Sequence, residues 1–187
     1  LKNVKENKDS AVKAYSEKFD KVSLNSFLVS EEEFIEAENA VSSDYKRILQ
    51  TAFDNIALFH KKQLRTGFEI KDGGKIIGQK VVPLKRVGLY VPGGTASYPS
   101  TVLMNAVPAL IAGVKEIVMV SPPMKNGKLR AEVLVAAKIA GIKEIYKIGG
   151  AQAVGALAYG TETIRKVDKI TGPGNIFVAT AKKQVFG

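Results

Sequence analysis

Three glycine-rich turns carry the polar residues of this chain that are best placed for chemistry. Each turn follows an apolar run and opens a helix-like segment, and the three lie within Arg86–Ser100, Lys147–Gly160 and Lys169–Thr180. A strand that ends in glycines and leads into a helix leaves backbone N–H groups free at the positive end of the helix dipole. Such a turn suits an anion such as a pyrophosphate. Three of them at one end of a parallel sheet could line a single crevice.

One polar side chain stands out in each turn: Tyr90, Gln152 and Asn175. Tyr90 could stack on a flat heterocycle or bond a ribose or phosphate, although its spacing alone favours a half-buried strand tyrosine. Gln152, among Ala and Gly residues, either caps its helix or faces a ligand, and the residues favour neither reading. Asn175 ends the segment GPGN, where it fits either a helix N-cap or an amide that binds a ligand.

Familiar nucleotide and catalytic motifs are missing from the chain. The spacing from Gly88 to Gly93 nearly matches a P-loop, but Gly94 replaces its lysine, which argues against an NTPase. The G-x-G-x-x-G dinucleotide fingerprint is absent as well. The chain has no Cys, and its single histidine, His60, falls on a predicted helix far from the turns. The residues alone therefore predict ligand binding without an evident catalytic or metal-binding set.

Composition indicates a globular protein with an uneven charge. With 187 residues, the chain can hold one medium domain, or one domain with an appendage. Its apolar stretches are too short to cross a bilayer, and the lack of Cys fits a reducing, cytoplasmic compartment. Residues 71–187 contain 17 Lys and Arg against 6 Asp and Glu. This charge could attract an anionic cofactor or simply be a solvated surface; the scattered basic residues make nucleic acid the weaker partner.

Two kinds of segment must position the turns. Residues 1–66 have helical periodicity, and we expect helices over Lys5–Phe19, Phe34–Val41 and Asp44–Leu64. A β-hairpin is predicted over Phe68–Val82, because Asp72–Gly73–Gly74 is a good hairpin turn. Together these segments form a predicted helical arm plus hairpin over residues 1–83.

From Leu84 onward, strand and helix signals alternate. The expected strands are Arg86–Val91, Glu116–Val120, Glu144–Ile148 and Lys169–Thr171, and the expected helices are Ser100–Ala112, Leu129–Ala140, Ala151–Tyr159 and Asn175–Val185. Strands that are apolar throughout are typical of a parallel sheet covered on both faces. We therefore predict an α/β fold: a parallel Rossmann-like sheet over residues 84–187 with helices on both faces, preceded by the helical N-terminal arm and the hairpin.

Several long segments resemble the histidinol dehydrogenase family. They are RVGLYVPGGTASYPSTVLMNAVPALIAGVKEIVMVSPP, KIGGAQAVGALAYGTE and VDKITGPGNIFVATAKKQV, together with AVKAYSEKFD near the start. The resemblance implies an NAD- and zinc-dependent oxidoreductase of histidine biosynthesis, which oxidises L-histidinol to L-histidine through the aldehyde. It also implies a cytoplasmic homodimer with no nucleic-acid or membrane partner, whose Rossmann-like domains bind the cofactor through loops unlike the usual fingerprint.

The resemblance also assigns roles to residues. The NAD contacts of the family include a Tyr, a Gln and an Asn in the three turns, and these match Tyr90, Gln152 and Asn175. The family's zinc ligands and its Glu–His pair lie downstream of the GPGN helix, beyond Gly187. We therefore expect no catalytic residue and no metal ligand in this chain, which looks cut at both ends and would be an inactive fragment.

Two alternatives of other classes stay open at this point. The chain could be a non-catalytic basic α/β module that binds an anion or a nucleic acid, since positive charge is concentrated in its second half. It could also be an aldehyde-dehydrogenase-like relative that acts on another substrate, in which case a nucleophilic Cys would follow beyond Gly187.

Overall fold

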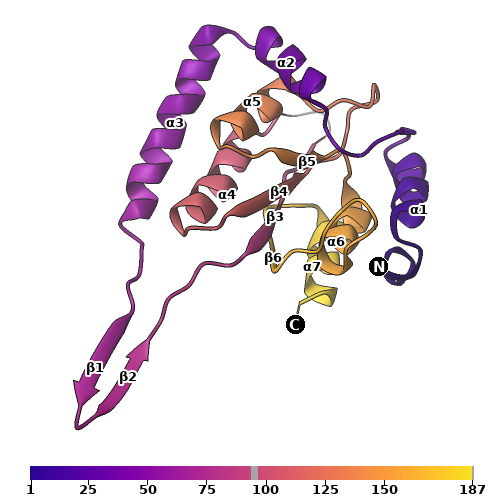
Figure 1. Ribbon diagram of the computed structural model, residues 1–187. Coiled ribbons are helices and arrows are strands. Elements are labelled where there is room, and N and C mark those ends of the chain that lie inside the picture. Colours follow the sequence, from indigo (N-terminus) through magenta and orange to yellow (C-terminus); the bar gives the residue numbers. More distant parts are fainter. Residues whose placement is uncertain (94–96, 187) are drawn as a thin grey trace.

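A helical arm and a hairpin precede an alternating α/β region in the computed structural model, which describes residues 1–93 and 97–186 (Figure 1). The first elements are α1 (Lys2–Phe19), α2 (Glu31–Ala40), α3 (Ser43–Lys61), β1 (Phe68–Asp72) and β2 (Lys75–Gln79). The later ones are β3 (Arg86–Tyr90), α4 (Pro99–Ile111), β4 (Glu116–Val120), α5 (Ala131–Ile139), β5 (Glu144–Tyr146), α6 (Gly150–Tyr159), β6 (Lys169–Thr171) and α7 (Ile176–Gln184). The predicted fold is confirmed. Gly94 and Thr95 of the first predicted turn lie outside the described residues.

The main sheet is parallel and has the strand order β5-β4-β3-β6. Val87 in the central strand β3 is paired with Ile117 of β4 on one side and with Lys169 of β6 on the other. The chain steps outward from β3 through β4 to β5, and then crosses back through α6 to the other side of β3. The direction of progress therefore reverses between β3 and β6, and ligands of such sheets bind beyond the carboxyl ends of the strands at this switch point.

Two hydrophobic cores cover the two faces of the sheet. Successive side chains of a strand point to opposite faces. Leu89 packs in one core with α4, α5 and the arm helices α2 and α3. Tyr90 packs in the other core with α1, α6 and α7. Helices thus cover both faces, as predicted, and the N-terminal arm contributes helices to each (Figure 1). The division of the chain at residue 83 stays a prediction.

The segment that follows α1 covers the outer edge of β5. Leu28 forms an antiparallel bridge with Tyr146, and the Lys147 N–H donates to the Phe27 carbonyl at 2.7 Å. The Lys147 ammonium also binds the Glu33 carboxylate of α2 at 2.9 Å, with both side chains largely buried. Because Lys147 lies two residues before Gly149, at the start of the second glycine turn, the arm both protects this sheet edge and fixes the start of the turn.

The β1–β2 hairpin projects away from the rest of the chain (Figure 1). Both strands are exposed along their whole length, including the apolar residues Phe68, Ile70, Ile76 and Ile77. An isolated two-stranded hairpin is at best marginally stable in water. Within the described residues, this hairpin therefore gains its stability from its own pairing rather than from burial.

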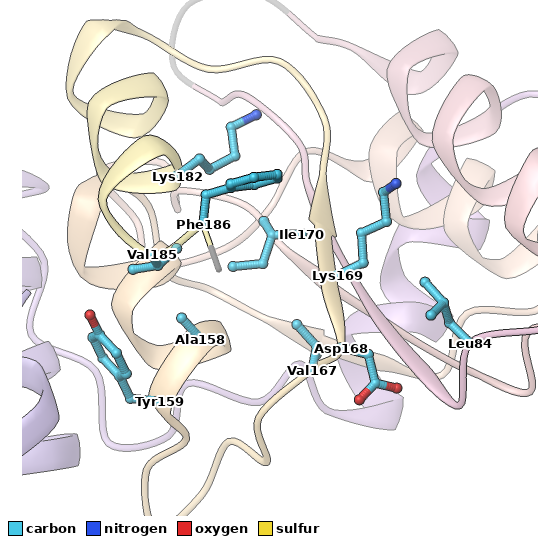
Figure 2. Close-up of a pocket in the computed structure, with 10 residues that line it drawn as sticks. All are labelled: Leu84, Ala158, Tyr159, Val167, Asp168, Lys169, Ile170, Lys182, Val185 and Phe186. Atoms are coloured by element: carbon cyan, nitrogen blue, oxygen red, sulfur yellow. The ribbon is translucent and has the colours of Figure 1, made fainter.

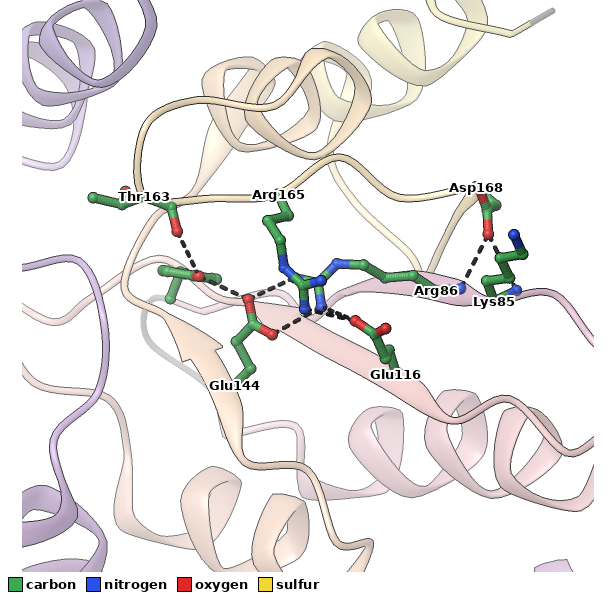
Figure 3. Close-up of polar contacts among 8 residues, drawn as sticks. Lys85, Arg86, Glu116, Glu144, Thr163, Arg165 and Asp168 are labelled. Atoms are coloured by element: carbon green, nitrogen blue, oxygen red, sulfur yellow. Dashed lines mark hydrogen bonds and ion pairs between the residues drawn. The ribbon is translucent and has the colours of Figure 1, made fainter.

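A cluster of charged side chains joins the amino ends of three strands (Figure 3). Arg86, which begins β3 and is 6% exposed, donates to Glu116 at 3.0 Å and to Glu144 at 2.9 and 2.5 Å. Arg165 also binds Glu116 at 2.6 Å, and the Tyr146 hydroxyl lies 2.7 Å from Glu144. The hydrogen bonds from Arg86 lower the pKa of Glu144 below its ordinary value. The cluster therefore holds β3, β4 and β5 in register at the end opposite the glycine turns.

Removal of one partner from this cluster should destabilise the fold. Glu144→Gln is expected to lower the free energy of unfolding by about 1–2 kcal/mol, because the nearly buried Arg86 then loses its closest opposite charge. Urea denaturation measures the change. Glu6→Gln, in the exposed Lys2–Glu6 pair, is the matched control and should cost less than about 0.5 kcal/mol. Equal losses in the two variants would contradict a special role for the cluster.

The same cluster predicts a dependence of stability on pH. A carboxyl group whose pKa is lowered by folding stabilises the protein above its unfolded-state pKa, and this contribution is lost as the pH falls through the folded pKa. The stability difference between the parent and Glu144→Gln should therefore be full at neutral pH and shrink below about pH 4. Denaturation curves recorded down to about pH 2 test this, and a difference that stays constant would disprove the pairing.

Candidate functional site

The predicted turns meet around Tyr90, at the carboxyl end of β3. The Tyr90 hydroxyl accepts a hydrogen bond from the backbone N–H of Gly150, in the second turn, at 3.0 Å. A Cβ atom built on Gly172, in the third turn, would lie 2.0 Å from the Tyr90 carbonyl oxygen. Tyr90 is therefore in contact with both later turns, at the switch point between β3 and β6.

The loop after β4 joins the first and second turns. A Cβ atom on Gly93 would lie 2.6 Å from the Pro122 carbonyl oxygen, and one on Gly149 would lie 2.5 Å from the Pro122 side chain. Residues without a side chain are needed for so close an approach. The segments that follow β3, β4, β5 and β6 are thus packed against one another at the same end of the sheet.

Gln152 lies inside α6 with an unsatisfied amide. The helix begins after Gly149 without a side-chain cap, so Gln152 does not cap it. Gln152 is 5% exposed, and its Nε2 is buried without a hydrogen-bond partner among the described residues. A buried donor that stays unpaired is costly, so this amide is poised for an acceptor that the protein does not supply. The side chain folds back over Gly150, whose φ of +64° suits glycine.

Asn175 caps α7, as one of the two sequence readings predicted. Its Oδ1 accepts a hydrogen bond from the Val178 N–H at 3.1 Å, while the residue itself stays exposed. Lys182, about two turns after Asn175 on α7, donates to the Gly172 carbonyl at 2.6 Å. The third turn therefore combines an exposed amide, a helix N-terminus and a nearby cation, a set that suits an anionic group.

Tyr90 is more deeply buried than its sequence context suggested. The residue is 4% exposed, so its ring packs in the core rather than offering a free face for stacking. Burial raises the pKa of the Tyr90 phenol, and the negative charge of Asp20 contributes in the same direction. The hydroxyl is therefore neutral near pH 7, and its observed task is to hold the Gly150 amide.

Sequence reasoning missed three residues that help to build this site: Pro122, Lys182 and Asp20. Pro122 and Lys182 have clear local contexts, since one follows a predicted strand and the other lies on the helix after GPGN. Asp20 has no such signal. It ends α1, some 70 residues before Tyr90 in the sequence, and only the packing of α1 against α6 brings it close.

The residues that the structure describes do not fit a metal ion. Among residues 1–93 and 97–186, no group of three or more His, Asp or Glu side chains is close enough to hold one. His60 lies on α3, where its Nδ1 is 2.6 Å from the Gln63 Oε1. It is not brought to the glycine turns. No chemical step that depends on zinc can therefore be assigned to these residues.

A cavity of about 680 Å³ lies beside the edge strand β6 rather than over the turns (Figure 2). The residues that line it come from α6, β6, α7, the segments that flank these elements and the segment before β3. They are Leu84, Ala158, Tyr159, Val167, Asp168, Lys169, Ile170, Lys182, Val185 and Phe186. Tyr90, Gln152 and Asn175 do not line it. The candidate site is therefore defined by the packed turns, and this cavity shares only Lys182 with it.

The close approach of the third turn to Tyr90 makes Gly172 sensitive to substitution. Gly172→Ala should lower the free energy of unfolding by at least about 3 kcal/mol, because its φ is +108° and the new Cβ overlaps the Tyr90 carbonyl. Gly141→Ala is a matched control, since Gly141 has a φ of +70° but nothing lies within 4 Å of its Cβ position. It should cost about 1 kcal/mol. Similar losses at both positions would mean that contact with Tyr90 is unimportant.

Comparison with known proteins agrees with the geometry. A family model described as histidinol dehydrogenase matches residues 1–187. The histidinol dehydrogenases of Geobacillus kaustophilus and Bacillus subtilis are 57% and 55% identical to this chain, each over 100% of it and 44% of the relative. The crystal structure of histidinol dehydrogenase from Elizabethkingia anophelis matches 98% of this chain and 43% of its own, with a TM-score of 0.94 and 41% identity. This chain spans less than half the length of these relatives, and it belongs to the histidinol dehydrogenase family.

Proposed function

We propose that this chain is the NAD-binding part of an enzyme that oxidises L-histidinol to L-histidine through the aldehyde. Membership of the family makes it part of a histidine-biosynthesis oxidoreductase. The observation that carries the assignment of NAD is the meeting of glycine turns at Tyr90, beside the unpaired Nε2 of Gln152. Family membership favours this proposal over a nucleic-acid-binding module and over an aldehyde-dehydrogenase-like relative.

The residues of the turns fit the chemistry of a dinucleotide. The first N–H groups of α6 and α7 have no partner within their helices. The Gly150 N–H is held by Tyr90 and the Val178 N–H by Asn175, and the others suit pyrophosphate oxygens. In this proposal the Gln152 amide donates to the nucleotide, and the exposed Asn175 and the half-buried Lys182 bind it from the third turn. When bound, NAD+ accepts a hydride from the substrate carbon.

Tyr90 acts in this proposal by positioning rather than by stacking. Its hydroxyl holds the Gly150 N–H at 3.0 Å, and its backbone lies against Gly172. Both later turns are thereby fixed relative to β3 before a ligand arrives. A site that is already ordered loses less conformational entropy when it binds.

The zinc ion and the catalytic residues of the proposed enzyme belong to the rest of the full-length protein. The described residues of this chain contain no fitting group of metal ligands, so we expect the chain alone to show no turnover. Residues 1–93 and 97–186 also contain no helix suited to crossing a bilayer. We propose a cytoplasmic homodimer, in which the exposed apolar side chains of the β1–β2 hairpin become buried.

Gln152→Leu in the full-length protein tests the central contact. We expect the affinity for NAD+ to fall at least tenfold, because the variant removes the only side-chain donor of Gln152. The melting temperature should stay the same or rise, since a buried unpaired amide is replaced by an apolar group. Calorimetric titration and thermal unfolding measure the two effects. Unchanged NAD+ affinity would refute the role of Gln152.

A second test separates the capping role of Asn175 from ligand binding. Asn175→Ala and Ser42→Ala each remove the side-chain cap of a helix, α7 and α3 respectively, and each should cost about 1 kcal/mol of stability. Only Asn175→Ala should weaken NAD+ binding, by about fivefold or more. If the two variants bind NAD+ equally well, Asn175 is a structural cap and nothing more.

A further inference from the structure

The turns of the candidate site lack a carboxylate that dinucleotide-binding sheets usually provide. In Rossmann folds, an Asp or Glu after the second strand accepts hydrogen bonds from the adenosine ribose hydroxyls. The strand in that place here is β4, which follows β3 through the first crossover helix. The sequence contains no Asp or Glu in residues 121–130 after β4, nor in the turns at residues 91–98, 147–152 and 172–175.

Asp20 reaches the same end of the sheet from the N-terminal arm. It directly follows α1, which packs on α6. The next residues of the chain lie on the loop after β4, because a Cβ atom on Gly127 would be 3.0 Å from the Leu24 side chain and 3.6 Å from that of Val22. Asp20 is also close enough to Tyr90 for its charge to act on the phenol. The arm therefore carries a carboxylate to the place where β4 supplies none.

One oxygen of the Asp20 carboxylate has no partner in the protein. Its Oδ2 is buried without a hydrogen-bond partner among the described residues. Ser16, four residues earlier on α1, is 2% exposed and has an unpaired Oγ. The Nε2 of Gln152, on the helix α6 that packs against α1, is unpaired as well. The two packed helices and the C-cap of α1 therefore carry an acceptor, a hydroxyl and an amide donor that lack partners among the described residues. Buried polar groups normally have partners, so this combination indicates a polar ligand.

We propose that Asp20 accepts hydrogen bonds from the adenosine ribose hydroxyls of NAD+ and thereby excludes NADP+. A 2′-phosphate at this position would face a carboxylate of like charge and could not donate the hydrogen bond that a hydroxyl provides. The inference rests on the proposed NAD function and adds a residue that sets the specificity for the cofactor. It gives the arm a direct part in binding as well as in packing.

Paired titrations of NAD+ and NADP+ with the full-length protein test the proposal. Asp20→Asn keeps the size of the side chain and removes its charge. We expect NAD+ affinity to fall about tenfold and NADP+ affinity to stay the same or rise, so the ratio of the two affinities falls at least tenfold. An unchanged ratio, including an equal loss for both nucleotides, would overturn the proposal. If Asp20→Asn melts at a much lower temperature than the parent, Asp20→Ser takes its place. The same ratio of NAD+ affinity to NADP+ affinity is then measured for Asp20→Ser, with the same expected result.

The parent protein and Gln152→Leu, titrated alongside, separate the role of Asp20 from the NAD function on which it rests. If the parent binds neither nucleotide, the NAD function and the role of Asp20 both fail. If the parent binds NAD+, Gln152→Leu loses it and Asp20→Asn leaves the ratio unchanged, only the role of Asp20 fails. Asp54→Asn, on the exposed surface of α3, is the matched control for charge and should leave both affinities unchanged.

Discussion

The contact of Tyr90 with two later turns is the constraint on which the rest of the structure depends. One atom of its side chain holds the Gly150 amide, and its backbone carbonyl excludes any side chain at Gly172. These contacts join the carboxyl end of β3 to the start of α6 and to the residue that follows β6. Because they lie at the switch point of the sheet, they fix several helix N-termini around one place. The fold thus brings together the helix N-termini of the proposed cofactor site without the usual dinucleotide fingerprint.

The N-terminal arm is part of this arrangement rather than an addition to it. Its helices enter both hydrophobic cores, and its Glu33 binds Lys147 just before the second turn. The charged cluster around Arg86 fixes the opposite end of the same strands. The sheet is therefore held at its amino ends by ion pairs and at its carboxyl ends by backbone packing, with the arm covering an edge. Rigid support on these sides allows unpaired polar groups such as the Gln152 amide to persist.

Local patterns predicted most of the fold, and tertiary contacts account for what they could not predict. The apolar run VGLYV indicated a buried strand, and a cap was one of the two roles that the sequence allowed for Asn175 after GPG, since both signals depend on neighbouring residues. The role of Gln152 could not be decided, because capping depends on the residue at which α6 begins. The kink at Lys8 (φ +49°) was not expected either; it is held by contacts such as that of the Lys8 ammonium with the distant Gly160 carbonyl. The place of Asp20 near Tyr90 could likewise not be predicted, because it depends on the packing of α1 against α6.

A crystal structure of the full-length protein with NAD+ bound tests the central claim most directly. The account predicts that the pyrophosphate lies over the packed turns, within hydrogen-bonding distance of the Gln152 amide and of the N-terminus of α6 or α7. The Tyr90–Gly150 hydrogen bond should be retained, since it belongs to the site before binding. Density for NAD+ elsewhere on the protein, with the Gln152 amide still unpaired, would contradict the account.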